Sequence, residues 1–206
     1  KVLARFQREG QSLESLFERV FEEACREVWA PPGYRTESLR LQLLGDLRRF
    51  LAEGRWLPGP ESDFERAFEW QAAPGLLLRG RIDRLDRTPG GEAVVVDYKY
   101  WRPGRVKEVK EDPAALQGPL YALGCRNTLG LEVAGVFYIS LKKETKCAGW
   151  GWGLGFDGEL SEEWLREGLE KALRAAGEIR AGRIEPRPSD PEICGYCEFR
   201  DVCRYE

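Results

Sequence analysis

Two short segments combine carboxylates and an ammonium group in a pattern that could do chemistry. Gly80-Arg81-Ile82-Asp83 is one, and Val94-Val95-Val96 running into Asp97-Tyr98-Lys99 is the other. In a strand, Asp97 and Lys99 point to the same face because side chains alternate. If the hairpin register places Asp83 beside Asp97, these groups form a donor set for a hard divalent cation such as Mg2+ or Mn2+. That arrangement suits phosphodiester hydrolysis, with Lys99 near the metal-bound water.

A purely structural reading of the same residues remains open. Asp97 and Lys99 could form an ion pair at a strand end, because a charge after a buried strand needs a partner. For Arg81, Arg84 and Asp86 we expect only ion pairs that stabilise the hairpin.

Composition limits the classes of protein to which the chain can belong. It has 206 residues, of which 42% are hydrophobic and 33% charged, typical of one folded domain. Its net charge of -3 excludes a strongly cationic nucleic-acid binder. The lack of histidine excludes Ser-His-Asp and Cys-His machinery and every zinc site that needs histidine. No apolar run is long enough for a membrane span and no signal peptide opens the chain. Because position 1 is not methionine, we expect the sequence to begin inside a longer protein.

Helices and a sheet are expected to position these groups. Residues 12–29, with Ser12 as N-cap, and residues 36–53, ending at Gly54, have helical periodicity. Branched and aromatic residues predict strands over 76–83, 93–101 and 133–141, with another over 63–70. The turn at 87–91 predicts an antiparallel hairpin. A helix is expected from Asp112-Pro113 to Leu123, kinked or delayed by Pro119. Residues 149–155 suggest a bulged edge strand or loop, and a last helix runs from Ser161 to Gly182.

Four motifs in this order resemble the PD-(D/E)XK nuclease superfamily. They are Gly80-x-x-Asp83, Asp97-Tyr98-Lys99, Gln117-x-x-x-Tyr121 and the tail from Gly182 to Cys203. The resemblance covers roughly residues 10–206. It is strongest to the RecB-like branch, which includes AddB-type nuclease domains and CRISPR-associated exonucleases with cysteine clusters. It implies an α/β fold: a mixed sheet flanked by helices, with a cysteine-rich C-terminal tail.

The resemblance also implies roles for individual residues. Asp83, Asp97 and the backbone carbonyl of Tyr98 would bind the metal, and Lys99 would be the catalytic lysine. Gln117 and Tyr121 would lie on one helix face near the active site and the DNA backbone. Without the resemblance, we would expect Gln117 to be solvated and Tyr121 to pack in the core.

Two further carboxylates come into consideration as ligands. Glu14 falls where many relatives carry a metal-binding histidine, but it is equally well explained as a first-turn acid favoured by the helix dipole. Glu65, on the expected strand at 63–70, is the weaker candidate, and we expect it to be solvated.

Three cysteines crowd the end of the chain as Cys194-x2-Cys197-x5-Cys203. This spacing favours a metal role in a reduced, cytoplasmic setting. By resemblance they would hold a structural [4Fe–4S] cluster, with Cys25 or a cysteine preceding Lys1 as fourth ligand. A zinc site or three reduced thiols remain alternatives. Cys125 and Cys147 are expected to be small core residues.

A nuclease also needs cations that contact DNA. Arg102, Arg105 and Lys107, in a basic loop expected over 102–110, are candidates, as are Lys142, Lys143 and Lys146 after the next strand. Among them Trp101, Trp150 and Trp152 could stack on unpaired bases. For any one of these residues alone, we favour the simpler explanation, a surface charge on a loop for the cations and core packing for the tryptophans.

Together these observations predict a single nuclease domain over 1–206. It has a helical part at about 1–55, a catalytic core at about 60–182 and a metal-binding tail at 183–206. We expect a Mg2+- or Mn2+-dependent DNA exonuclease acting on single-stranded or duplex ends. The resemblance implies a helicase region in the same polypeptide or in a partner subunit, recombinational repair as the setting, and no membrane. The alternatives are a stand-alone CRISPR-associated exonuclease and a non-catalytic iron–sulfur module that binds DNA ends.

Overall fold

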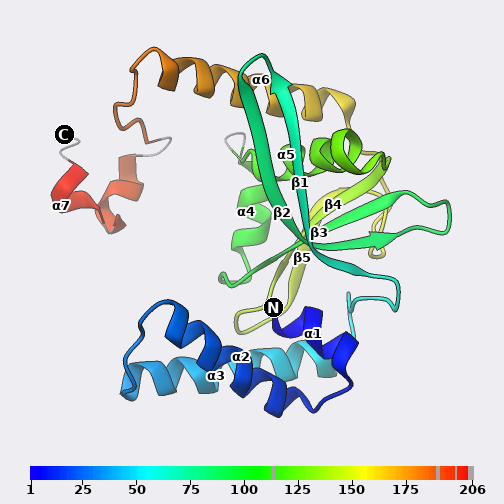
Figure 1. Cartoon of the computed structure of the whole chain (residues 1–206), viewed down its shortest axis with the longest axis vertical. Coiled ribbons are helices and arrows are strands. Elements are labelled where there is room, and N and C mark those ends of the chain that lie inside the picture. Colours follow the sequence, from blue (N-terminus) through cyan, green and yellow to red (C-terminus); the bar gives the residue numbers. More distant parts are fainter. Residues whose placement is uncertain (113–114, 189–190, 198, 204–206) are drawn as a thin grey trace.

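The apolar run Val94-Val95-Val96 forms the centre of a five-stranded sheet (Figure 1). The computed structural model describes residues 1–112, 115–188, 191–197 and 199–203. The sheet order follows the sequence: β1 (Asp63–Ala73), β2 (Leu76–Arg87), β3 (Ala93–Lys99), β4 (Val133–Ser140) and β5 (Lys146–Gly151). Only β3 and β4 pair in parallel; the other neighbours are antiparallel. The expected mixed sheet, the hairpin and the edge strand are therefore confirmed.

Helices connect the two parallel strands, as parallel pairing requires. They are α4 (Arg105–Glu111), α5 (Gln117–Gly124) and the π-helical turn η1 (Cys125–Leu129). Pro119 lies in the first turn of α5, where a missing N–H costs no hydrogen bond, so it delays the helix start as expected. Pro113, expected to open this helix, lies outside the described residues. The basic loop expected over 102–110 is wrong, because most of that stretch is α4.

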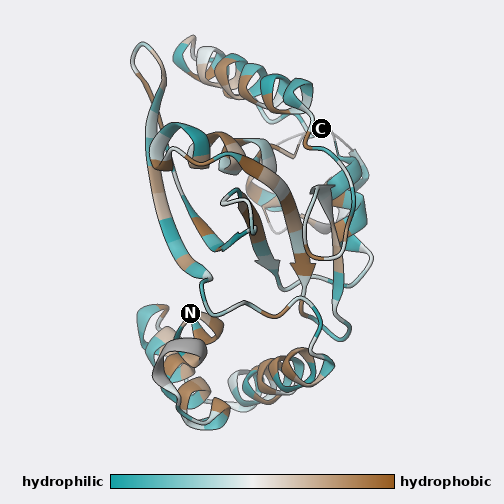
Figure 2. Ribbon diagram, turned by 90° about the vertical axis from the view of Figure 1, so that its right-hand side faces the viewer, coloured by the Kyte–Doolittle hydropathy of each residue, from teal (hydrophilic) through white to brown (hydrophobic). Residues whose placement is uncertain are grey.

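Both faces of the sheet are covered, which explains the uninterrupted valine run. On one face Val95 packs with Leu85, with Ala122 of α5 and with Leu165 of α6 (Glu162–Arg180). On the other face, the core contains Val94, Val96, Phe137 and Ile139, together with Leu3 and Phe50 from the N-terminal helices. Figure 2 shows hydrophobic segments concentrated on the central strands.

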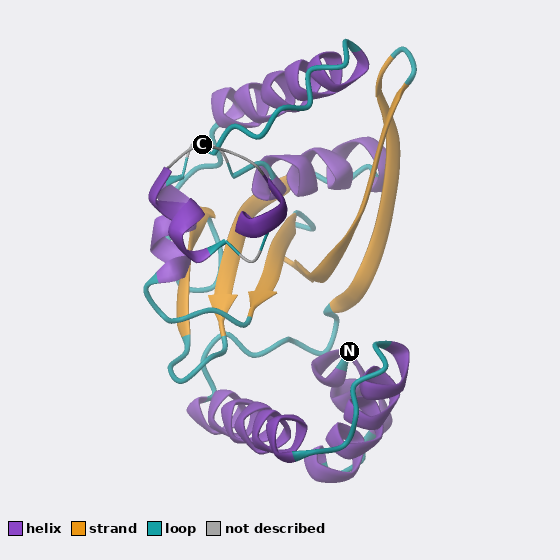
Figure 3. Cartoon of the chain, turned by 90° about the vertical axis from the view of Figure 1, so that its left-hand side faces the viewer, coloured by secondary structure: helices purple, strands orange, loops and turns teal. Residues whose placement is uncertain are grey.

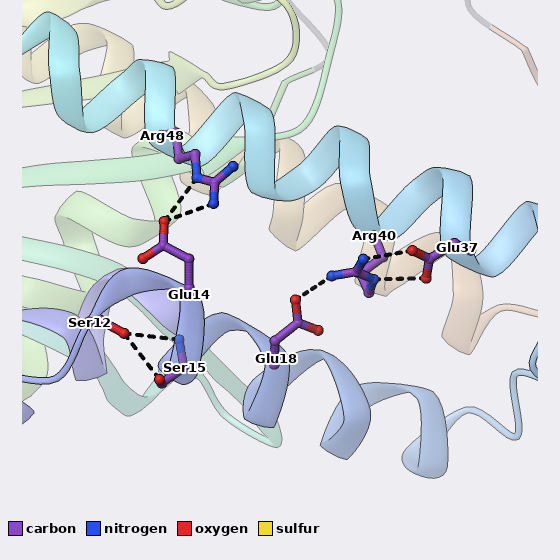
Figure 4. A network of polar contacts seen from close by, with 7 residues as sticks. All are labelled: Ser12, Glu14, Ser15, Glu18, Glu37, Arg40 and Arg48. Carbon is purple, nitrogen blue, oxygen red and sulfur yellow. Dashed lines mark hydrogen bonds and ion pairs between the residues drawn. The ribbon is translucent and has the colours of Figure 1, made fainter.

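The N-terminal helices form a lobe beside one end of the sheet (Figure 3). They are α1 (Val2–Glu9), α2 (Leu13–Glu27) and α3 (Tyr34–Glu53); α1 was not expected from the sequence. The Ser12 hydroxyl accepts a hydrogen bond from the Ser15 N–H, which confirms the expected N-cap. Ion pairs hold α2 against α3, among them Glu18 with Arg40 (Figure 4).

The last described segment of the chain, which follows the long helix α6, lies on the opposite side of the sheet from the turn between β2 and β3 (Figure 1). The Ser161 hydroxyl caps α6 by accepting the Trp164 N–H, as expected. Beyond it lie the 3-10 turn η2 (Pro191–Tyr196) and the short helix α7 (Arg200–Cys203). In the described part of the chain, no helix is both long and apolar enough to cross a membrane.

Candidate active site

The hairpin register brings the two key carboxylates together. The pairs between β2 and β3 run from Arg87–Ala93 to Arg84–Val96. One further step in this register sets Asp83 opposite Asp97. At this point the Tyr98 N–H donates to a side chain instead of a backbone carbonyl: Asp83 Oδ2 accepts it at 2.9 Å. The condition stated from the sequence, Asp83 beside Asp97, is therefore met.

A local irregularity in β1 lies next to Asp83. Phe64 packs with Val94 and Val96, whereas Phe68 packs on the other face of the sheet with Val95. Residues four apart in a regular strand share a face, so the strand changes phase between them. Glu65, opposite Asp83 in the register, has φ of 54°, the left-handed region that β-strands do not use. The left-handed backbone conformation of Glu65 is therefore the point at which the side chains of β1 change faces.

An amide from α5 links the charged groups of β3. Gln117 Oε1 accepts from Lys99 Nζ at 2.7 Å, and Gln117 Nε2 lies 2.9 Å from Asp97 Oδ1 and 2.7 Å from the Tyr121 hydroxyl. Lys99 Nζ is also 2.8 Å from Asp97 Oδ2. The structure thus brings together Asp83, Asp97, Lys99, Gln117 and Tyr121, with the Tyr98 backbone between them.

Burial controls the electrostatics of this cluster. Asp97 is only 2% exposed, and burial raises its pKa to about 6 although the Lys99 ammonium opposes the shift. Burial also raises the pKa of Asp83, against the opposing effect of the Tyr98 N–H. Asp97 Oδ2 forms an ion pair with Lys99 but accepts no hydrogen bond from the described residues. A buried carboxylate oxygen without a hydrogen bond fits the demands of a bound cation.

Arg84 supports the cluster from the opposite face of the sheet. Its side chain is 1% exposed and bonds Asp86 with two nitrogens at 2.7 and 2.5 Å. It also donates to the Tyr98 hydroxyl at 2.7 Å and to the backbone carbonyls of Trp56 and Leu57. The expected ion pair with Asp86 is confirmed. The contact between Arg84 and the Tyr98 hydroxyl was not expected from the sequence.

Asp46 is a buried carboxylate that sequence reasoning missed. It accepts the Tyr100 hydroxyl at 2.7 Å, the Lys143 N–H at 3.1 Å and the Arg49 guanidinium at 2.6 Å. These bonds join α3 to the chain directly after Lys99. Its position in the sequence could have indicated that it is buried, because Asp46 lies four residues before the buried Phe50 and thus on the apolar side of the helix.

Several candidate residues lie apart from this cluster. Glu14 pairs with Arg48 at 2.9 Å on the exposed side of the helical lobe (Figure 4). Arg102 and Arg105 both pair with Glu108, and Lys107 is an exposed residue of α4.

The aromatic candidates and Glu65 have different surroundings. Trp150 packs against Trp164 with ring centroids 4.3 Å apart and is partly buried against the cluster of Val106, Tyr138 and Ala148, whereas Trp152 is 45% exposed. Trp101 lies under the cations of Lys99 and Arg105. Glu65 is half-buried and forms an ion pair with Arg81 at 2.8 Å.

The described cysteines do not form a metal centre by themselves. Cys194, Cys197 and Cys203 are half-buried and free, as is Cys25 on α2. Among the described residues, no three His, Cys, Asp or Glu side chains are grouped to hold a metal ion. Cys125 is a buried core residue, as expected; burial raises its pKa to about 12.

The chain matches one family model and is similar to solved structures. Residues 1–204 match the family described as the PD-(D/E)XK nuclease superfamily. The chain is similar to the solved structure of SSO0001 at 16% identity, with 98% of this chain and 83% of that chain covered and a TM-score of 0.46. It is also similar to a protein from Eubacterium rectale described as a candidate exonuclease, at 14% identity, 99% and 74% coverage and a TM-score of 0.47. A search of curated proteins found no match.

Proposed function

Because the chain belongs to the PD-(D/E)XK nuclease superfamily, we propose that it is a divalent-metal-dependent DNA exonuclease domain. The observation that supports this is the meeting of Asp83, Asp97 and Lys99 at the end of β3, held by Gln117. Two carboxylates and one ammonium gathered at one strand end, with Lys99 in an ion pair with Asp97, match what phosphodiester hydrolysis requires.

Asp83, Asp97 and the Tyr98 carbonyl are the groups that would hold Mg2+ or Mn2+. Both carboxylates have raised pKa values through burial, so a cation would replace the protons that they favour. The bound metal would polarise the scissile phosphate and lower the pKa of the attacking water. Asp97 Oδ2, whose contact among the described residues is the ion pair with Lys99, would be a ligand of the cation.

Lys99 would stabilise negative charge that develops on the phosphate, or orient the attacking water. Its ammonium is held by a hydrogen bond to Gln117 Oε1 and an ion pair with Asp97 Oδ2, so little reorganisation is needed when substrate arrives. Gln117 and Tyr121 act as positioning residues in this proposal. Arg102, Arg105 and Lys107 are proposed to contact phosphates of the DNA.

The finer classification rests on the resemblance to RecB-like nucleases. It favours an AddB-type nuclease domain over 1–206, with a helical part at 1–55, a core at 60–182 and a tail at 183–206. Such a domain works with a helicase in end processing for recombinational repair. The stand-alone CRISPR-associated exonuclease is the alternative within the same branch. A non-catalytic end-binding module is disfavoured because Asp83, Asp97 and Lys99 are all present.

Cys194, Cys197 and Cys203 are proposed to bind a [4Fe–4S] cluster, with Cys25 as the fourth ligand in this chain and zinc as the alternative metal. A shared cluster would require the C-terminal tail to lie against α2, and exposed apolar side chains near Cys25 and near Cys203 support this contact. Trp29 is 91% exposed four residues after Cys25, and Phe199 and Val202 are 67% and 73% exposed beside Cys203. Anaerobic purification followed by iron, sulfide and zinc analysis tests this. A Cys25→Ser variant that keeps full iron and sulfide content would exclude Cys25.

The catalytic proposal is tested by digestion of end-labelled linear DNA, single-stranded and duplex, with Mg2+ or Mn2+. We expect metal-dependent release of label by the wild type and none by Asp97→Ala. Asp157→Ala, which removes an exposed carboxylate, is the matched control and should cut normally. Equal cutting by wild type and Asp97→Ala would refute the assignment. Retained end binding without cutting by the wild type would favour the non-catalytic module.

A further inference from the structure

A cavity of about 390 Å³ separates the helical lobe from the ends of the strands. The side toward the lobe is mostly apolar and includes Phe17, Phe21, Ala24, Leu43 and Leu47, with the charged Lys1 and Asp46 also in its lining. Asp83 and Lys99 line the same cavity from the sheet. The proposed catalytic groups therefore face an apolar chamber as well as solvent.

The shape and lining of this cavity suit one nucleotide. Its volume falls in the range of small-ligand pockets and is too small for a base pair with its backbone. Phe17 and Phe21 stack with ring centroids 5.6 Å apart, and Phe17 is 3% exposed, so the apolar wall is rigid. A nucleotide has the same polarity as the cavity: an apolar, aromatic base at one end and a phosphate at the other.

We infer that this cavity binds the unpaired base next to the scissile phosphate, so that the domain cuts only strands whose end is unstacked. The inference rests on the proposed function, because it places the phosphate at Asp83 and Lys99. A base inside a duplex would have to leave its stack to enter, at an energetic cost that a single-stranded end avoids. Single-stranded ends are therefore the preferred substrate.

Filling the cavity tests this without touching the catalytic cluster. Ala24→Phe adds a ring at the cavity wall, and Leu43→Phe does so from α3. Ala52→Phe, at an exposed position of the same lobe, is the matched control. Thermal melting identifies any variant that fails to fold. If either Ala24→Phe or Leu43→Phe fails to fold, the other is used for the test.

The cutting assay uses single-stranded oligonucleotides with an abasic residue at either end, compared with intact ones. Because a stacked base contributes about 1–3 kcal/mol, we expect the wild type to cut the abasic end on the order of 10- to 100-fold more slowly. The filling variants should lose a similar factor on intact DNA and show no further loss on abasic DNA. Ala52→Phe should behave as wild type. Equal cutting of abasic and intact ends by the wild type would overturn the inference while leaving the nuclease proposal standing.

A binding measurement separates the two proposals if no cutting occurs. A terminal 2-aminopurine, in EDTA so that no cleavage takes place, reports whether the base enters an apolar site. We expect its fluorescence to change with wild type and Ala52→Phe but not with Ala24→Phe or Leu43→Phe. An identical response from all four proteins would contradict base binding in this cavity. A cavity-dependent response without metal-dependent cutting would instead refute only the nuclease proposal.

Discussion

Replacing Asp97 with asparagine should stabilise the metal-free protein at neutral pH. The carboxylate is 2% exposed and one of its oxygens accepts no hydrogen bond from the described residues. Its charge is therefore costly to keep in the folded state, even beside Lys99. Asparagine has nearly the same shape, and its amide oxygen can still accept from Gln117 Nε2. The substitution removes the charge and replaces the ion pair with Lys99 by an NH2 group facing the ammonium, a cost that the relief of the buried charge must exceed.

The size of the effect follows from linkage. Burial raises the pKa of Asp97 from 3.8 to about 6 in the folded protein. Between these two values the folded state holds a proton that the unfolded state has lost, so this group's contribution to stability falls as pH rises. From pH 5 to pH 8 the wild type should lose about 1–2 kcal/mol relative to Asp97→Asn. Taking the difference between the unfolding free energies of the two proteins cancels the contributions of all groups that titrate alike in both.

Urea denaturation at pH 5, 6.5 and 8 in EDTA measures this difference. Asp157→Asn, at an exposed carboxylate, is the control and should follow the wild type at every pH. Addition of Mg2+ at pH 8 should then stabilise the wild type and not Asp97→Asn, because ligand binding to the folded state raises its stability.

Two results would refute the reasoning. If the stability gap between wild type and Asp97→Asn stayed constant from pH 5 to pH 8, the carboxylate would not carry a raised pKa. If Asp97→Asn were the less stable protein at pH 8, the Lys99 ion pair would outweigh the burial of the charge. The second outcome would support the purely structural reading of the Asp97–Lys99 pair.

Three further predictions concern the surroundings of the site. Gln117→Glu places a third negative charge beside Asp97, so the acidic limb of the pH–rate profile should move to higher pH, whereas a loss of activity at all pH values would mean that Lys99 is displaced. Gly124→Ala would bring a Cβ within 2.6 Å of the Phe68 ring, so its free energy of unfolding, measured by urea denaturation, should fall by about 1–3 kcal/mol. An unchanged urea midpoint would mean that the ring can move aside without cost. Asp46→Ala removes a buried ion pair and two hydrogen bonds, and should cost about 2–4 kcal/mol by urea denaturation; a loss below about 0.5 kcal/mol would exclude its role in joining α3 to the sheet.

Local patterns predicted most of the fold because local physics decides those elements. Ser12 and Ser161 both cap helices through a hydroxyl, as their spacing from the apolar stripe indicates. The valine run is buried because both faces of the sheet are covered. The turn at 87–91 fixed the hairpin, and the hairpin register in turn brought Asp83 to Asp97.

The remaining features depend on contacts between distant residues. The segment 102–110 is rich in charge and contains Pro103 and Gly104, which favours a loop, yet α4 forms because Val106 is fully buried against Tyr138 and Ala148. Periodicity within so short a segment cannot reveal a partner on another strand. Asp46 was missed for a similar reason: its partners Tyr100 and Lys143 are far away in the sequence.

The position of Gln117 shows how the fold limits which residues the site can tolerate. Its amide accepts a bond from the Lys99 ammonium through oxygen and donates through nitrogen to the Asp97 carboxylate and the Tyr121 hydroxyl. Only a side chain with both an acceptor and a donor satisfies a cation and an anion at once. A glutamate would repel Asp97, and a lysine would repel Lys99. A leucine would leave Lys99, Asp97 and Tyr121 each one hydrogen bond short. The requirement becomes visible only when the first turn of α5, delayed by Pro119, is placed against the end of β3.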